Sequence, residues 1–109
     1  MEQRKFPRMK TKIAAEVNNS QAVLENVSKQ GLKMILWSHA VPENRDISVM
    51  FAVGEKKINL KGEIRWCMRD KYSIQDLKVV GLYIENAPEE YHQFVDSLSA
   101  RKDSQAVRN

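Results

Sequence analysis

Two arginines four residues apart open the sequence, and their side chains are suited to holding an anionic ligand. Arg4 and Arg8 each carry a planar, permanently charged guanidinium group. Such a fork can bind a phosphate through two hydrogen bonds, or the O6 and N7 atoms of a guanine. Pro7 has no N–H and biases Phe6 toward an extended conformation, so we expect an extended arm in which the arginines lie about 13 Å apart. The pair could then reach different parts of one guanine nucleotide.

A second polar group follows at Asn26-x-Ser28-x-x-Gly31. The Asn26 amide donates and accepts hydrogen bonds, so it can read a base edge or orient an arginine. Ser28 adds a compact hydroxyl, on the same face as Asn26 if the chain is extended. Gly31 permits a positive φ and a close approach of a ligand to the backbone. Taken alone, this segment is more readily interpreted as a surface turn, because Asn, Ser and Gly are ordinary turn residues.

The arginine spacing by itself decides nothing, because Arg65 and Arg69 repeat it. They lie in an alternating segment that predicts a strand, where residues i and i+4 share a face. That second pair is therefore interpreted as a solvent-exposed stripe. The first pair differs in preceding the first predicted strand and in being followed by the Asn-x-Ser-x-x-Gly group.

Together, the two groups resemble the two-part signature of PilZ domains, the bacterial receptors for cyclic di-GMP. Later segments are also similar to that family: Gly62-Glu-Ile-Arg-Trp66 and Val80-Gly-Leu-Tyr-Ile84 resemble its last barrel strands, and a helix after Pro88 resembles its closing element. The resemblance covers residues 3–98. It implies an all-β fold, a six-stranded antiparallel Greek-key barrel with a C-terminal helix.

The resemblance also implies which residues would bind cyclic di-GMP. Arg4 and Arg8 would be the main anchors, Asn26 and Ser28 would read base edges, and Gly31 would set the turn. Many family members have aspartate at the position of Asn26. The secondary positions are Gln3, where members often carry a further arginine, and Trp66, whose indole could stack on a guanine but whose alternation pattern places it in the core or at its rim.

The implied role is a non-catalytic receptor whose N-terminal arm becomes ordered on the ligand and which then signals to an unidentified partner protein. The output would be control of motility, biofilm formation or secretion. The alternative is a PilZ-like protein–protein interaction module that does not bind nucleotide. We expect a monomer or a homodimer.

Composition and charge narrow the other function classes. The formal charge of +4 is concentrated in residues 1–12, which hold five basic residues and one acidic residue, while the rest balances 13 against 13. A basic arm on a neutral body, with only 7% aromatic residues, argues against a nucleic-acid partner. His39 and His92 lack metal-ligand spacing and no nucleophile motif is present, so we expect no catalysis, no metal and no cofactor.

The chain is expected to form one cytoplasmic domain without membrane insertion. Its 109 residues, 42% of them hydrophobic, suffice for one modest core. No apolar run could span a bilayer, the charged N-terminus lacks a secretory signal, and the lone Cys67 suits a reducing compartment. We expect a flexible basic arm at 1–9, a barrel with its closing helix at 10–99, and a frayed polar tail at 100–109.

Alternating hydrophobicity predicts six strands and one helix. Gly62 lies inside the longest strand, which indicates a bulge or bend, and Ile64, Trp66 and Met68 are assigned to its apolar face. The helix opens after Pro88. Its apolar stripe consists of Tyr91, Phe94, Val95 and Leu98. The predicted strands are 10–17, 21–27, 32–37, 45–53, 57–68 and 77–84.

Overall fold

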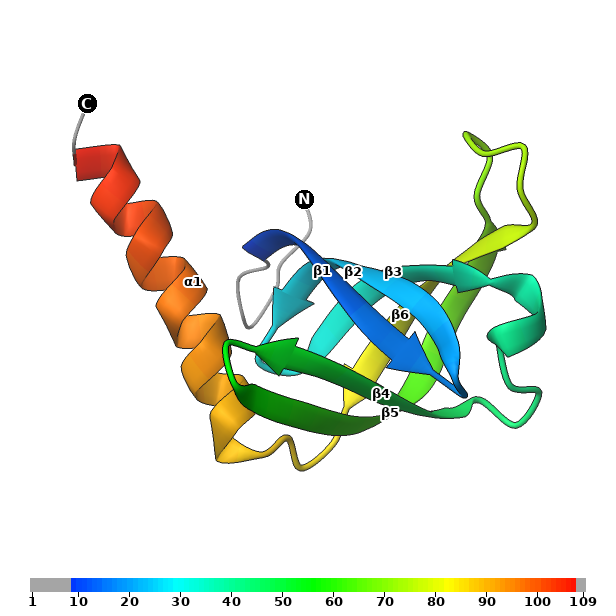
Figure 1. Ribbon diagram of the computed structural model, residues 1–109, viewed down its shortest axis with the longest axis horizontal. Coiled ribbons are helices and arrows are strands. Elements are labelled where there is room, and N and C mark those ends of the chain that lie inside the picture. Colours follow the sequence, from blue (N-terminus) through cyan, green and yellow to red (C-terminus); the bar gives the residue numbers. More distant parts are fainter. Residues whose placement is uncertain (1–8, 108–109) are drawn as a thin grey trace.

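Six antiparallel strands form a closed barrel, and one helix packs against its end (Figure 1). The computed structural model describes residues 9–107, with the side chains of residues 9–98. The elements are β1 (Met9–Val17), β2 (Ser20–Ser28), β3 (Gly31–Trp37), the short 3₁₀ helix η1 (Ser38–Ala40), β4 (Asp46–Val53), β5 (Lys56–Arg69), β6 (Leu77–Ile84) and α1 (Glu89–Val107).

The strand order around the barrel is β1-β2-β3-β6-β5-β4, and pairing of β1 with β4 closes it. Closure pairs the outer edges of β1 and β4, which would otherwise invite aggregation. Asn18 and Asn19 connect β1 to β2 with φ values of 51° and 64°, the pattern of a type I′ turn, whose twist matches that of the flanking strands. The predicted all-β, six-stranded antiparallel barrel with a C-terminal helix is confirmed.

Alternate strand side chains point inward and form the core. Most of the predicted apolar face of β4 is buried: Ile47, Val49 and Phe51 are each less than 5% exposed, whereas Val53, which we also predict on this face, is 37% exposed at the end of the strand. Burial of such aliphatic and aromatic surface is the main favourable term in folding. The other largest fully buried side chains are Tyr91, Leu24, Met34, Leu36, Val17, Val27 and Val80.

Helix α1 covers one end of the barrel with the predicted apolar stripe. Tyr91, Phe94 and Val95 are buried and Leu98 packs beside them; the Phe94 and Phe51 rings are 5.4 Å apart. The helix continues to Val107, through most of the segment for which we predict a polar tail, and the fraying of that tail stays a prediction. Within the described residues, no helix is long and apolar enough to cross a membrane.

A β-bulge corrects our assignment of the end of β5. Pairing with β6 shifts between Ile64 and Trp66, so Arg65 is an extra residue that reverses the alternation. Trp66 and Met68 therefore face outward, and Met68 is 54% exposed. The prediction that both share the inner face with Ile64 is wrong, because it assumed an unbroken ladder. Of the bulge or bend predicted at Gly62, the bulge is wrong, since pairing continues through that residue, and the bend stays a prediction.

Candidate functional site

The residues of the Asn-x-Ser-x-x-Gly group lie together at one end of the barrel. We call the segment from Asn26 to Gly31 the motif turn; it comprises the end of β2, two connecting residues and the start of β3. Val27 points into the core and is fully buried, so Asn26 and Ser28 share the outer face, as predicted. Both are half-buried. Gln3, Arg4 and Arg8 lie outside the described residues.

Helix α1 holds the motif turn through a buried tyrosine. The Tyr91 hydroxyl donates to the carbonyl oxygens of Ser28 and Gly31, at 2.6 and 3.2 Å. Burial raises the pKa of this Tyr91 hydroxyl well above its ordinary value, so it stays a hydrogen-bond donor across the physiological range. A second link joins Lys29 Nζ to Asp96 Oδ1 at 3.1 Å. The turn is therefore tied to the helix at two points.

Gly31 serves packing rather than an unusual backbone conformation. Its φ is not positive, contrary to one of the two reasons we gave for a glycine there. A Cβ built at Gly31 would lie 2.5 Å from the Leu82 carbonyl oxygen, closer than real Cβ atoms approach. The glycine thus lets β3 lie against β6. The Ser28 hydroxyl donates to the Gly31 carbonyl oxygen at 3.2 Å, which closes the turn.

Cross-strand pairing places a row of outward-facing residues beside Asn26. Asn26 pairs with Lys10 and Lys33, Lys33 pairs with Gly81, and Gly81 pairs with Trp66. A Cβ at Gly81 would clash with the Trp66 indole, so that ring covers the glycine. Because neighbouring strands lie about 4.8 Å apart, the ring is roughly 10 Å from Asn26. This outer row combines an amide, two ammonium groups and an aromatic face.

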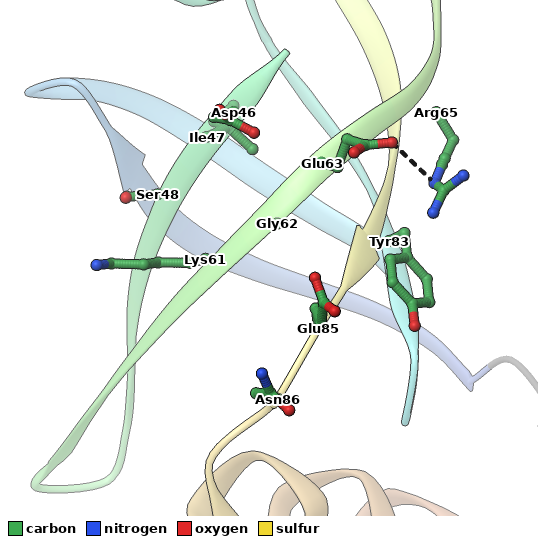
Figure 2. A pocket seen from close by; sticks show the side chains of 10 residues that line it. All are labelled: Asp46, Ile47, Ser48, Lys61, Gly62, Glu63, Arg65, Tyr83, Glu85 and Asn86. Atoms are coloured by element: carbon green, nitrogen blue, oxygen red, sulfur yellow. Dashed lines mark ion pairs between the residues drawn. The ribbon is translucent and has the colours of Figure 1, made fainter.

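A second row lies next to the first and contains an ordered arginine. Ser28 pairs with Gly31, Gly31 with Tyr83, and Tyr83 with Glu63. The Arg65 guanidinium lies over the Tyr83 ring, 4.7 Å from its centroid, and its Nε is 3.3 Å from Glu63 Oε1. Figure 2 shows Arg65 above Tyr83 with this ion pair as a dashed line.

Sequence reasoning missed three residues of this region: Lys33, Arg65 and Tyr91. Arg65 was assigned to a solvent-exposed stripe, and Tyr91 only to the core. Lys33 could have been found, because it follows the buried Leu32 in an alternating strand and must face outward. Nothing in the sequence indicates the partners of Arg65 or of the Tyr91 hydroxyl, because these contacts depend on the bulge and on the helix position.

Two grooves on the outer surface of the barrel lie near these rows. One, of about 600 Å³, is lined by Lys33 and Trp66 from the outer row and extends to Tyr72 in the β5–β6 loop. The other, of about 730 Å³, lies over β4, β5 and β6 and contains no motif residue. Its lining holds three carboxylates, those of Asp46, Glu63 and Glu85, and two cations, those of Lys61 and Arg65 (Figure 2), so acidic groups outnumber basic ones in it. In the first groove the cations of Lys33, Arg69 and Lys71 outnumber the carboxylates of Glu25 and Asp70, so it is the better extension of an anion site.

The described residues contain no cluster of three or more His, Cys, Asp or Glu side chains that could hold a metal ion. The side chains gathered around the motif turn are amides, hydroxyls, cations and aromatic rings. Such groups bind phosphates by charge and hydrogen bonding, and bases by stacking or edge contacts.

A closed six-stranded antiparallel barrel with a C-terminal helix, and a polar turn beside that helix, defines the fold class. The family model of the PilZ domain matches residues 2–100, and the chain belongs to the PilZ family. This family is associated with cyclic di-GMP as ligand and with partner proteins.

Structural comparison supports the fold. A solved structure of the Bacillus subtilis inhibitor of motility, MotI/DgrA, is similar to this chain with a TM-score of 0.77 and 12% identity. The alignment covers 95% of this chain and 53% of that one, so this chain spans about half the length of its structural neighbour. At this identity the likeness concerns the fold alone. No curated protein sequence matches the chain significantly.

Proposed function

We propose that this chain is a non-catalytic receptor for cyclic di-GMP. Arg4 and Arg8 bind phosphates and guanine edges of the ligand, and Asn26 and Ser28 read the bases from the motif turn. Gly31 keeps β3 close to β6 so that the turn holds its shape. The family membership supports the ligand class, and the geometry around the motif turn supports the proposed roles of Asn26 and Ser28.

One observation supports this proposal most strongly: the register of β1 on β2. Met9 pairs with Val27, and Lys10 pairs with Asn26. Consecutive Cα atoms are about 3.8 Å apart, so we expect Arg8 close to Asn26 and Ser28. An arm that entered the barrel at its opposite end could not bring its arginines to this turn. The register thus agrees with a site built from both parts of the signature.

The outer row supplies further contacts for the same ligand. Lys33 brings a positive charge next to Asn26, which favours a phosphate there. The Trp66 indole over Gly81 offers a flat surface on which a guanine can stack. Trp66 is therefore kept as a ligand contact, on the outer surface rather than at the rim of the core. Gln3 remains a secondary contact of the arm.

The proposed mechanism orders the arm on the ligand and changes the surface that a partner protein meets. A flexible segment that folds on binding loses conformational entropy at that step. The charge-assisted contacts of its arginines with the ligand offset this loss. Because the motif turn is tied to α1 through Tyr91 and Lys29, the helix is the element best placed to sense occupancy. The motility inhibitor among the structural neighbours suggests motility as one output to test.

Titration calorimetry tests the proposal directly. The unmodified chain should bind cyclic di-GMP and not GTP or cyclic di-AMP. Arg8→Ala should cost on the order of 2 kcal/mol or more in binding, because a charge-assisted, bidentate contact is lost. Lys57→Ala removes an exposed cation that lines neither groove; it is the matched control and should bind as the unmodified chain does. Affinity should also fall as salt is added; unchanged affinity of Arg8→Ala would contradict the site.

A second candidate function is a protein–protein interaction module that does not bind nucleotide, and the β5–β6 loop favours it. This loop projects from the end of the barrel opposite α1 (Figure 1). Tyr72 and Ile74 in it are fully exposed, although the loop is held by a 2.7 Å hydrogen bond from Ser38 Oγ to Asp76 Oδ1. Large apolar side chains on an ordered loop are typical of protein contacts. Absence of any heat with cyclic di-GMP would favour this function.

A further inference from the structure

We propose that Arg65 is an additional arginine of the ligand site, held across β6 to bind the side of the ligand that faces away from the arm. This inference rests on the proposed function and adds a residue that the two-part signature does not contain. Arg65 would bind an acceptor pair of the ligand, either two phosphate oxygens or the O6 and N7 edge of a guanine, through its guanidinium fork.

The bulge in β5 is the first step of the argument. In a regular strand, neighbouring side chains point to opposite faces. The register shift between Ile64 and Trp66 makes Arg65 the extra residue, and both Arg65 and Trp66 lie on the outer face. Bulges commonly re-aim side chains next to functional sites. Here two adjacent residues extend over β6, toward the strands that carry the motif turn.

The positions of these two side chains are the second step. Trp66 covers Gly81 in the row of Asn26. Arg65 covers Tyr83, which belongs to the row of Ser28. Trp66 therefore lies in the same row as Asn26, and Arg65 lies in the same row as Ser28. Within each row the members on β2 and β6 are two strand spacings apart, about 10 Å. A ligand built from two nucleotides can bridge that distance.

The order imposed on Arg65 is the third step. Its guanidinium is stacked on Tyr83, 4.7 Å from the ring centroid, and Glu63 accepts from its Nε–H at 3.3 Å. A guanidinium carries five N–H donors, so this ion pair leaves the fork of terminal nitrogens for another acceptor. Holding the side chain in place beforehand lowers the entropy lost on binding. Glu63 and Tyr83 are therefore positioning residues.

The experiment compares the affinity of matched variants for cyclic di-GMP by titration calorimetry. Arg65→Ala should weaken binding by about tenfold or more, as expected for loss of a charge-assisted contact. Arg65→Lys should not restore it, because the ammonium keeps the charge but lacks the fork. Lys57→Ala removes an exposed cation from the same strand, away from both grooves, and should change affinity less than twofold.

The positioning role of Tyr83 has its own readout. Tyr83→Phe keeps the aromatic face and should bind like the unmodified chain, whereas Tyr83→Leu removes the face and should weaken binding. In Tyr83→Leu, the NMR signal of the Arg65 Nε–H should also move toward that of an unstructured arginine. A change of this signal without a change in affinity would mean that stacking on Tyr83 does not position Arg65 for binding.

The outcomes separate this inference from the proposed function. If the unmodified chain binds and Arg65→Ala binds equally well, the assignment of Arg65 is overturned and the receptor function stands. If Arg65→Lys fully restores affinity, the bidentate contact is overturned. If the unmodified chain does not bind cyclic di-GMP at all, both the function and the assignment of Arg65 are overturned.

Discussion

The Tyr91 hydroxyl donates a 2.6 Å hydrogen bond to the carbonyl oxygen of Ser28, which precedes it by 63 residues. This contact joins the first turn of α1 to the turn that carries the proposed base-reading residues. Since the same hydroxyl also contacts the Gly31 carbonyl oxygen, both ends of the connection between β2 and β3 depend on one side chain. A shift of this turn on ligand binding would be transmitted to the helix.

Tyr91→Phe should lower the free energy of unfolding by about 1–3 kcal/mol, because the Ser28 carbonyl oxygen loses the Tyr91 hydroxyl as a donor and the Gly31 carbonyl oxygen keeps only the Ser28 hydroxyl, while the ring volume is kept. Denaturant unfolding followed by circular dichroism measures this loss. Tyr72→Phe removes a hydroxyl from a fully exposed tyrosine and should leave stability unchanged. Equal stability of the two variants would show that the Tyr91 contact contributes nothing.

Stability should also depend on pH through Tyr91. The pKa of its hydroxyl is raised in the folded protein by burial, so the folded state keeps this proton when the unfolded state begins to lose it, near pH 10. Above that pH the unfolded state binds fewer protons, and the free energy of unfolding falls by up to about 1.4 kcal/mol per pH unit. Below it, this contribution is fully present.

The measurement is the difference between two unfolding curves. To isolate the contribution of Tyr91, the unmodified chain and Tyr91→Phe are compared at pH 8, 10 and 11. The gap in stability between them should shrink as the pH rises. A constant gap would mean that the hydroxyl ionises alike in the folded and unfolded states.

Gly31→Ala should destabilise the barrel by about 1–3 kcal/mol, as overpacking does. The new methyl group would lie 2.5 Å from the Leu82 carbonyl oxygen, and backbone on β6 must move to admit it. Lys29→Ala, two residues away, removes only an exposed ion pair and should cost no more than about 1 kcal/mol. Thermal unfolding of both variants tests the difference. Similar melting temperatures would show that Gly31 is not needed for the packing of β3 against β6.

The sequence was sufficient to predict the strands, because one face of each is buried and the period of two is visible. Ile47, Val49 and Phe51 show this for β4. The helix could be predicted for the same reason, from the stripe that begins at Tyr91. Both predictions depend only on local patterning and on the need to bury apolar surface.

The outward position of Trp66 could not be predicted, because no particular residue type in the sequence marks the extra residue of this bulge. The alternation of Ile64, Trp66 and Met68 is regular in the sequence and is broken only by the pairing with β6. The partner of the Tyr91 hydroxyl is likewise set by the position of the helix on the barrel. The polar groups of the motif turn were found from their residue types, whereas Arg65 required the tertiary contact with Tyr83.

Gly81→Ala should displace the Trp66 indole, because the new methyl group would occupy the space of that ring. The clashing atoms belong to the far end of a side chain, so the ring can move into solvent at modest cost to stability. In a Trp37→Phe background, where Trp66 is the remaining tryptophan, fluorescence emission should shift to longer wavelength. Gly54→Ala, whose methyl group would meet open space, should leave the emission unchanged.

If Trp66 stacks on a base, Gly81→Ala should also lose about 1–3 kcal/mol of cyclic di-GMP binding free energy. Full affinity despite a shifted emission would show that Trp66 is not part of the site.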